Sequence, residues 1–308
     1  MTPPAFSVVI GTLHRPEHAV SAVRSILDGS WDDLEVLVID QSRDDRTRAA
    51  IAGIADPRVV YIHSDVMGLS RARNLGVARS RAPLLAFLDD DAVAEPGWLA
   101  AFAETFASDP RAGIVGGRLL PRWEASCPAW FPQAHAHLLG LYDIGDARCD
   151  FPGRDLPMGG NFAIASEVLR ALNGFDPRLG FDASRASHAI AGEDTALAEG
   201  VRAAGLRLVY EPRATVRHLV PAVKLRPTYY LHRMYWGGRS MAYLRRIRPA
   251  PRVVAGARRS APMRNLALST RGFAPSVMRA LGSLAVVAGM WTERFAGAAT
   301  RRGPRDPA

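Results

Sequence analysis

The chain has 308 residues, 48% of them hydrophobic, so it can bury a substantial core, which excludes a wholly disordered protein. Its two cysteines and the lack of a charged and then apolar leader before Phe6 indicate neither a disulfide framework nor secretion, and we expect a cytoplasmic protein. The apolar stretch from Leu281 to Trp291 is shorter than the ~20 residues that a spanning helix needs, so we expect no membrane span.

The net charge of +9 is divided unevenly along the chain. Residues before Leu219 include 22 basic and 28 acidic side chains, whereas residues from Leu219 onward include 17 basic and 2 acidic ones. We therefore expect two parts, a domain over residues 1–218 and a basic helical extension over residues 219–308. A basic segment can bind phosphate-bearing ligands, anionic lipid or nucleic acid, and charge does not separate these partners.

Short apolar strands alternate with helices over the first ninety residues. Strands are predicted at Phe6–Ile10, Glu35–Ile39, Val59–Ile62 and Leu84–Leu88, and helices at Pro16–Leu27 and Leu69–Ala78. This alternation predicts an α/β fold with a mostly parallel sheet. Because ligands bind at the carboxyl edge of such a sheet, we expect Asp40 and Asp89–Asp91, which follow two of these strands, to converge on one crevice.

The middle of the chain alternates regular and irregular segments. A helix through Trp98 leads to a strand at Gly113–Gly117, and the segment Pro121–Pro157, which has no sustained period, is predicted to be a long functional loop. Further predicted features are a regular segment at Gly159–Ile164, a helix capped by Ser166, a helix that opens at Gly192, and strands at Arg207–Tyr210 and Ala214–Arg217. The C-terminal part is predicted to be helical, with an apolar stripe through Val277, Leu281, Leu284, Ala288, Trp291 and Phe295.

Three adjacent carboxylates, Asp89 to Asp91, follow a buried strand. Two like charges ~4 Å apart repel by about 4 kcal/mol at an effective dielectric near 20, and a bound cation would remove that cost. Mg²⁺ and Mn²⁺ favour oxygen ligands, and Mg²⁺ is usually held by one or two carboxylates together with substrate phosphates. The triplet therefore indicates a divalent metal site, and a solvated turn or helix cap at Asp89 is the alternative.

The stretch from Gly68 to Trp98, GLSRARNLGVARSRAPLLAFLDDDAVAEPGW, resembles glycosyltransferase family 2, in which an Ala-Arg-Asn-x-Gly helix precedes a strand that ends at Asp-x-Asp. Four other pieces agree in order: SVVIGT, VLVIDQS, GGNFAI, and GED followed by a strand and His218. The resemblance covers Phe6 to Tyr243. It implies the GT-A fold with a mixed, mostly parallel central sheet, a nucleotide-binding half over about 1–91, an acceptor half over about 92–218 and a helical C-terminal extension.

The resemblance also assigns donor-binding residues, and six positions match: Thr12, Arg15, Asp40, Arg73, Asp89 and Asp90. It implies that Asp40 hydrogen-bonds the base ring, that Arg73 contacts the base or the diphosphate, and that Asp89 lies on the ribose side. The first loop departs from the family, because it reads Gly-Thr-Leu-His-Arg where the family commonly has Pro-Thr-Tyr-Asn-Arg. A helix cap at Asp40 and a surface role for Arg73 are the alternatives.

The metal ligands and the general base follow from the same resemblance. It implies that Asp91 and His218 bind Mn²⁺ or Mg²⁺, and that Asp194 takes the proton from the acceptor hydroxyl. The donor-sugar and acceptor side would be lined by Gly159, Gly160, Asn161 and Glu193. A structural histidine and plain helix capping by the Glu-Asp pair remain the alternatives.

Together these residues predict an inverting glycosyltransferase that moves one hexosyl or deoxyhexosyl unit from a UDP-, dTDP- or GDP-linked donor to an acceptor hydroxyl, in glycan, polysaccharide or glycosylated-metabolite biosynthesis. A dehydrogenase is disfavoured because no Gly-x-Gly-x-x-Gly follows Ile10, and the loop after that strand lacks the phosphate-binding pattern of a nucleotidyltransferase. A processive synthase is disfavoured because Gln-x-x-Arg-Trp does not occur. A catalytically inactive nucleotide-sugar-binding protein remains the alternative.

The basic extension is expected to pack its apolar stripe on the catalytic domain and to place Arg233 and Arg239 near the donor phosphates. The alternative is that it lies on an anionic membrane at the inner face, which would suit a lipid-linked acceptor. No nucleic-acid partner is expected.

Overall fold

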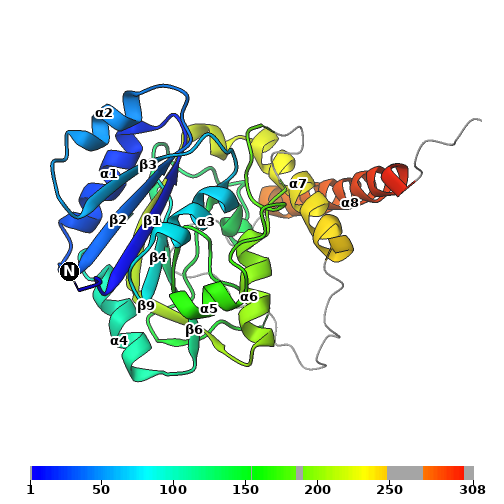
Figure 1. The fold of residues 1–308 in the computed structure, drawn as a ribbon. Coiled ribbons are helices and arrows are strands. Elements are labelled where there is room, and N and C mark those ends of the chain that lie inside the picture. Colours follow the sequence, from blue (N-terminus) through cyan, green and yellow to red (C-terminus); the bar gives the residue numbers. More distant parts are fainter. Residues whose placement is uncertain (1, 154, 185–189, 248–272, 302–308) are drawn as a thin grey trace, which may run out of the picture.

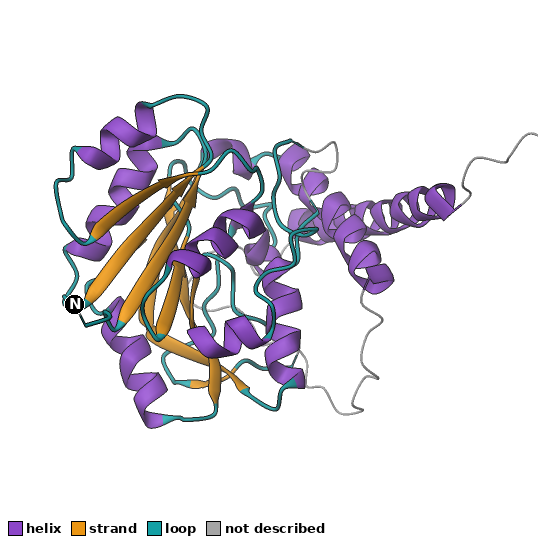
Figure 2. Cartoon of the chain, in the orientation of Figure 1, coloured by secondary structure: helices purple, strands orange, loops and turns teal. Residues whose placement is uncertain are grey.

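The computed structural model describes residues 2–153, 155–184, 190–247 and 273–301. Within these residues nine strands form one sheet, in the order β3-β2-β1-β4-β8-β6-β9-β5 with β7 paired to β9. Helices pack on both faces of the sheet, and two long helices extend from one side of it (Figures 1 and 2). The mixed, mostly parallel sheet that the sequence predicts is therefore present.

The first half of the sheet is parallel, and its elements are β1 (Phe6–Thr12), α1 (Pro16–Leu27), β2 (Leu34–Asp40), α2 (Arg46–Ala52), β3 (Val59–His63), α3 (Leu69–Arg79) and β4 (Leu84–Leu88). The register pairs Thr12 with Asp40, so both residues lie at the carboxyl edge. Helix α2 was not predicted, because only two of its residues, Thr47 and Ile51, are buried and its apolar periodicity is therefore weak.

The second half adds β5 (Ala92–Ala94), α4 (Trp98–Ser108), β6 (Ala112–Trp123), the 3₁₀ helix η1 (Gln133–Leu139), β7 (Cys149–Asp150), β8 (Asn161–Ala165), α5 (Ser166–Ala171), α6 (Glu193–Ala203) and β9 (Arg207–Val220). Strand β8 runs antiparallel between β4 and β6, and β6 and β9 pair in parallel along most of their length. This makes the sheet mixed.

Three local predictions are wrong. The segment 121–157 is not loop throughout, because it contains the end of β6, η1 and β7. The two strands predicted before His218 are one strand, β9, with an irregularity in the middle. Ser166 does not cap α5: Ala165 precedes the helix, and the buried Ser166 hydroxyl has no hydrogen-bond partner among the described residues.

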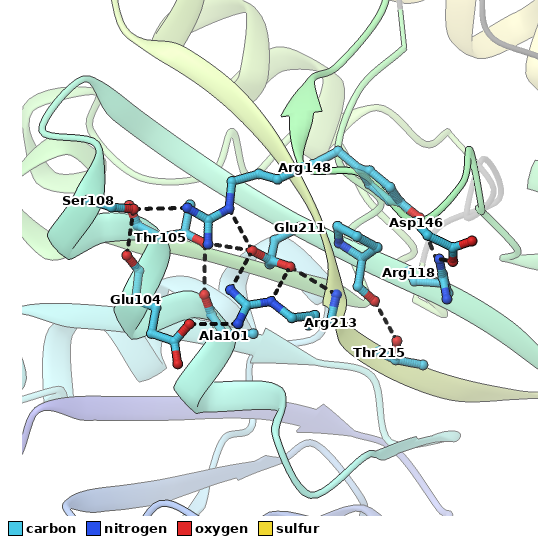
Figure 3. Close-up of polar contacts among 12 residues, drawn as sticks. Ala101, Glu104, Thr105, Ser108, Arg118, Asp146, Arg148, Glu211, Arg213 and Thr215 are labelled. Atoms are coloured by element: carbon cyan, nitrogen blue, oxygen red, sulfur yellow. Dashed lines mark hydrogen bonds and ion pairs between the residues drawn. The ribbon is translucent and has the colours of Figure 1, made fainter.

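The irregularity in β9 is held by the buried carboxylate of Glu211. The pairing with β6 shifts register between Gly117–Glu211 and Arg118–Thr215. Figure 3 shows Glu211 between two arginines: its Oε2 accepts from Arg148 Nε at 2.7 Å, and its Oε1 accepts from Arg213 Nε at 3.0 Å. These bonds hold the strand at the register shift, and beyond it β9 continues to His218 at the carboxyl edge of the sheet.

The C-terminal extension is a helix pair, formed by α7 (Pro227–Ile247) and α8 (Phe273–Arg301) and preceded by the 3₁₀ helix η2 (Ala222–Leu225). The two helices cross at two glycines, since a Cβ on Gly238 would lie 2.8 Å from the Val286 carbonyl carbon and one on Gly289 would lie 2.9 Å from that of Tyr235. No helix among the described residues is both long and apolar enough to cross a bilayer.

The expected packing of the apolar stripe is wrong. Helix α8 turns its Gly282 and Gly289 side toward α7, and the stripe faces solvent. Leu284 is 67% exposed and Trp291 54% exposed, with Val277, Leu281 and Ala288 also exposed. The side chain of Phe295 lies outside the described residues. Small residues allow a closer approach of two helices than the branched and aromatic stripe does, which explains the choice of face.

Candidate active site

A pocket of about 560 Å³ opens at the carboxyl edge of the sheet, a volume suited to a small-molecule ligand. Eleven of the residues singled out from the sequence line it: Thr12, Arg15, Arg73, Asp89, Asp90, Asp91, Gly159, Gly160, Glu193, Asp194 and His218. Asp40 and Asn161 do not line it, and neither does Arg239 of the extension. The convergence expected from strand order is thus present for Asp89 to Asp91, whereas Asp40 does not line the pocket.

Sheet pairing brings the acidic triplet to His218. Strand β5 begins directly after the triplet and runs antiparallel to β9, with Ala92 opposite His218. As a result, one ligand atom from each of Asp89, Asp91 and His218 lies within 4.8 Å of the others. His218 Nε2 lies 3.2 Å from Asp91 Oδ1. Two carboxylates and one imidazole fit Mn²⁺ or Mg²⁺ with further ligands from a substrate phosphate.

The three carboxylates of the triplet differ in their surroundings. Burial raises the pKa of Asp90 to about 6, although Arg15 and the Thr12 hydroxyl, which donates to it at 2.8 Å, act in the opposite direction. Burial also acts to raise the pKa of Asp91, but the hydrogen bond and charge of His218 outweigh it and hold that pKa below the usual range. Asp91 therefore stays ionised to a lower pH than Asp90 does.

Arg73 joins the triplet to the Glu-Asp pair of α6. Its side chain is buried, and it donates to Asp89 at 3.1 Å, to Glu193 at 3.1 Å and to the Gly159 carbonyl at 2.8 Å. The guanidinium also lies 5.4 Å from the centre of the Phe175 ring. A planar fork with five donors can serve three acceptors at once, which a lysine cannot do with the same geometry.

Asp194 lies in the first turn of α6 and is half-buried at the pocket wall. Its Oδ2 accepts from the Gly159 amide at 3.2 Å and its Oδ1 from the Thr195 amide at 2.7 Å. Burial, with the neighbouring charge of Glu193, raises its pKa, while Arg73 and the two amides act against the rise. A carboxylate with a raised pKa at a pocket wall is suited to accept a proton.

Gly160 leaves room for Asp89, since a Cβ on it would lie 2.8 Å from Asp89 Cγ. The adjacent Asn161 is fully buried. Its Oδ1 accepts from the Trp98 indole at 2.7 Å, and its Nδ2 donates to the carbonyls of Arg118 and Ala214 at 2.8 and 2.9 Å. It holds strands together behind the pocket, and its role on the donor-sugar side stays a prediction.

Asp40 is also fully buried. Its carboxylate accepts from the amide and hydroxyl of Ser42 and from the Tyr61 hydroxyl, at 2.5 to 2.9 Å. The next residue, Gln41, lines the pocket in its place. The predicted contact between Asp40 and the base stays a prediction.

Comparison with known proteins decides the family. The model of glycosyl transferase family 2 matches residues 7–172, which is more than half of the chain. The chain belongs to glycosyltransferase family 2. The resemblance carried by the Ala-Arg-Asn helix and the acidic triplet is confirmed, and so is the expected enzyme class.

This family 2 glycosyltransferase is similar to curated proteins with different names and to a solved mannosyltransferase. It is 28% identical to a glucosyl-dolichyl phosphate glucuronosyltransferase of Haloferax volcanii over 76% of this chain and 75% of that protein. It is 26% identical to the succinoglycan biosynthesis protein ExoM of Rhizobium meliloti, over 68% of this chain and 65% of that protein. A solved mannosyltransferase of Pyrobaculum calidifontis, in complex with GDP-Man and Mn²⁺, superimposes with a TM-score of 0.61 over 99% of this chain and 77% of that chain at 18% identity, which confirms the GT-A fold.

Several pocket residues of this glycosyltransferase were not predicted from the sequence. They come from the loop after β2, from η1, and from the extension: Gln41, His137, Lys224 and Tyr229. Arg233 also lines the pocket, and its expected position near the donor phosphates stays a prediction. Arg239 does not line the pocket, because it donates to Glu293 of α8 at 2.8 Å. A signal for the α7 residues was available, since Tyr229 and Arg233 are four residues apart and so share a helix face.

Proposed function

We propose that this enzyme transfers a single sugar from a nucleotide-diphosphate sugar to an acceptor hydroxyl, with inversion at the anomeric carbon and with a divalent cation. The observation that carries the proposal is the placement, in one pocket, of a three-residue cation site and of a carboxylate with a raised pKa at a helix start. The GDP-Man and Mn²⁺ held by the Pyrobaculum mannosyltransferase support both the donor class and the cation.

The residues divide the work of the reaction. Asp89, Asp91 and His218 would hold the cation, which neutralises charge on the departing diphosphate when bound. Asp194 accepts the proton of the acceptor hydroxyl, whose oxygen forms a bond to the anomeric carbon as the bond to the phosphate oxygen breaks. The electron pair of that bond leaves with the diphosphate, and attack from the opposite face inverts the configuration.

The donor class is tested with a panel of UDP-, dTDP- and GDP-linked sugars, with and without Mn²⁺, in a thermal-shift assay. A ligand at 100 times its Kd stabilises a protein by ~2.7 kcal/mol, so the correct base and sugar should stand out. Donor hydrolysis or transfer in the same conditions separates an enzyme from an inactive binding protein. Binding without any turnover of donor would favour the inactive protein.

We further propose that the extension contacts an anionic membrane surface and that the acceptor is a lipid-linked or glycan hydroxyl, in cell-surface glycan or glycosylated-metabolite biosynthesis. The name of the Haloferax relative, which includes a dolichyl phosphate, supports a lipid-linked acceptor. The exposed apolar face of α8 and the 17 basic against 2 acidic residues from Leu219 onward support the surface contact, since each Lys or Arg near such a surface contributes ~1 kcal/mol.

Flotation with vesicles containing anionic lipid tests the surface contact. We expect binding at low salt, and less binding for Trp291→Glu than for Thr292→Glu, which adds the same charge at the next position. Absence of wild-type flotation at low salt, where attraction is strongest, would exclude the contact.

A further inference from the structure

Two cations from the C-terminal extension reach into the pocket of the catalytic domain. Lys224 of η2 and Arg233 of α7 both line it, together with Tyr229, which is one helical turn before Arg233. Neither cation belongs to the segment that the family model covers, residues 7–172. The extension therefore supplies part of the pocket wall, with residues that lie outside the segment matched by the family model.

Lys224 lies beside the cation site. Its side chain is 21% exposed, and its Nζ is 3.9 Å from Asp91 Oδ2. The charged groups nearest to it are the carboxylates of Asp91 and Asp89 and the guanidinium groups of Arg15 and Arg233. The ammonium group is thus mostly buried at the pocket wall and lies between carboxylates of the candidate cation site and two guanidinium groups.

Arg233 has no hydrogen bond or ion pair with the residues that the structure describes, and its Nε is buried without a partner. Two other arginines of α7 behave differently, because Arg239 and Arg246 both donate to Glu293, at 2.8 and 2.9 Å. A buried N–H without an acceptor is destabilising, because the hydrogen bond that it loses to water is not replaced. A ligand that brings acceptor oxygens would satisfy it.

We propose that Lys224 and Arg233 bind a phosphate group in this pocket. The inference rests on the proposed function, because these two cations would bind the same donor or acceptor that the proposed reaction uses, in addition to the metal ion. A phosphate offers several anionic oxygens; a guanidinium can bind two of them side by side, and an ammonium binds one as a point charge. The donor diphosphate and a phosphate on the acceptor share this chemistry, and the position of Lys224 next to Asp91 favours the donor diphosphate.

The test uses the full chain and the variants Lys224→Met and Arg233→Gln, with Arg226→Gln as the matched control. Arg226 lies between the two cations in sequence, is exposed and does not line the pocket. Affinities for UDP and GDP, and for the corresponding nucleosides, are measured by calorimetry with Mn²⁺. We expect each pocket variant to bind the diphosphate at least tenfold more weakly, a change of about 1.4 kcal/mol, because each loses a hydrogen bond to a charged group. Nucleoside affinity and the control should not change.

A second arm identifies the source of the phosphate. If diphosphate affinity is unchanged but a short-chain polyprenyl phosphate binds the two variants more weakly than the wild type, the site holds the acceptor phosphate. If both probes bind the variants and the wild type equally, the inference is overturned. A wild-type protein that binds no nucleoside diphosphate with Mn²⁺ contradicts the proposed function instead, so the two failures are distinguishable. Equal thermal midpoints of unfolding exclude a folding defect as the cause of any loss.

Discussion

Arg73 shows how one buried side chain can organise a site. It neutralises part of the charge of Asp89 and Glu193 and holds the Gly159 carbonyl, so three separate segments meet at one guanidinium. Losing a partner from a buried ion pair typically costs 3–5 kcal/mol, because the remaining charges are left uncompensated. The pocket is therefore preorganised by a residue that belongs to neither the cation site nor the helix start.

Asp91→Ala should abolish metal-dependent transfer and leave the fold intact. Asp91 directly precedes β5 and would contribute a charged ligand atom to the proposed cation site, not apolar area to the core. Product formation is measured with and without added Mn²⁺, and circular dichroism checks the fold. Asp65→Ala, at a side chain that is 97% exposed, is the control. Near-normal activity of the Asp91 variant without added metal would contradict this assignment.

Asp194→Asn should lose turnover and keep donor affinity. The amide preserves the size of the side chain, and its single oxygen can still accept one of the two backbone hydrogen bonds, but it cannot take a proton at neutral pH. We expect kcat to fall by about 10²–10⁴, the usual contribution of a general base, while the Kd of the donor changes little. If kcat stays within several-fold of the wild type, Asp194 only stabilises the helix start, and Glu193 becomes the next candidate.

The dependence of activity on pH should show an acidic limb that is set by the pKa of Asp194. Its pKa is raised by burial and by Glu193, so if Asp194 is the base, it is protonated, and the enzyme inactive, at a higher pH than an ordinary aspartate with pKa ≈ 3.9 would give. Activity should therefore fall as the pH is lowered through this raised value. Because Arg73 lowers the pKa of Asp194, Arg73→Gln should move the acidic limb of kcat/KM further up the pH scale. A limb that stays in place would show that another group titrates.

Among the elements, β9 combines two tasks. Its first part is held to α4 and to the loop before β7 through Glu211, and its last part brings His218 to the candidate cation site beside Asp89 and Asp91. The Glu211 bonds also link stability to pH. Burial acts to raise the pKa of Glu211, but the bonds from Arg213 and Arg148 outweigh it and lower that pKa. This contribution to stability is present above the unfolded-state pKa of about 4.3 and is lost as the pH falls through the lower folded-state value.

Gly238→Ala should destabilise the helix pair, whereas Gly237→Ala should not. A Cβ on Gly238 meets the backbone of Val286, while one on Gly237 meets nothing within 4 Å. Overpacking against backbone costs about 1–3 kcal/mol, and alanine in an open helix position gains up to about 1 kcal/mol over glycine. The free energy of unfolding of both variants, from urea titration, checks this. Equal changes would mean that the helices do not cross at Gly238.

Element prediction from the sequence worked where one period dominated. Strands with buried runs, such as β1 and β2, and helix α1 with its single apolar face were found with nearly correct bounds. Short strands such as β5 and β7 were missed, because three or two residues carry no measurable alternation. The stripe on α8 was read correctly as a helix face but assigned to the wrong side, since glycine packing depends on the partner helix and not on hydrophobicity.

At the scale of the whole molecule, the pocket spans the predicted boundary at residue 218. Local sequence patterns were enough to find the acidic triplet and Arg73. The triplet directly follows an apolar strand, and Arg73 belongs to the Ala-Arg-Asn motif. Lys224 was not singled out among the many basic residues of the extension, and of the two arginines that were, Arg233 and Arg239, only Arg233 lines the pocket. The division into two domains therefore stays a prediction, although the charge changes sharply there.

The same pocket has a consequence for the order in which ligands bind. Among the described residues that line it, five are formally anionic, Asp89, Asp90, Asp91, Glu193 and Asp194, and four are formally cationic, Arg15, Arg73, Lys224 and Arg233, which leaves −1. A nucleotide-diphosphate sugar, with its own double negative charge, would enter against this field, whereas a divalent cation reverses it to +1. Electroneutrality thus favours cation first or cation and donor together. We expect donor affinity to rise with Mn²⁺ concentration and, by reciprocity, Mn²⁺ affinity to rise by the same factor with donor present, which paired titrations would measure.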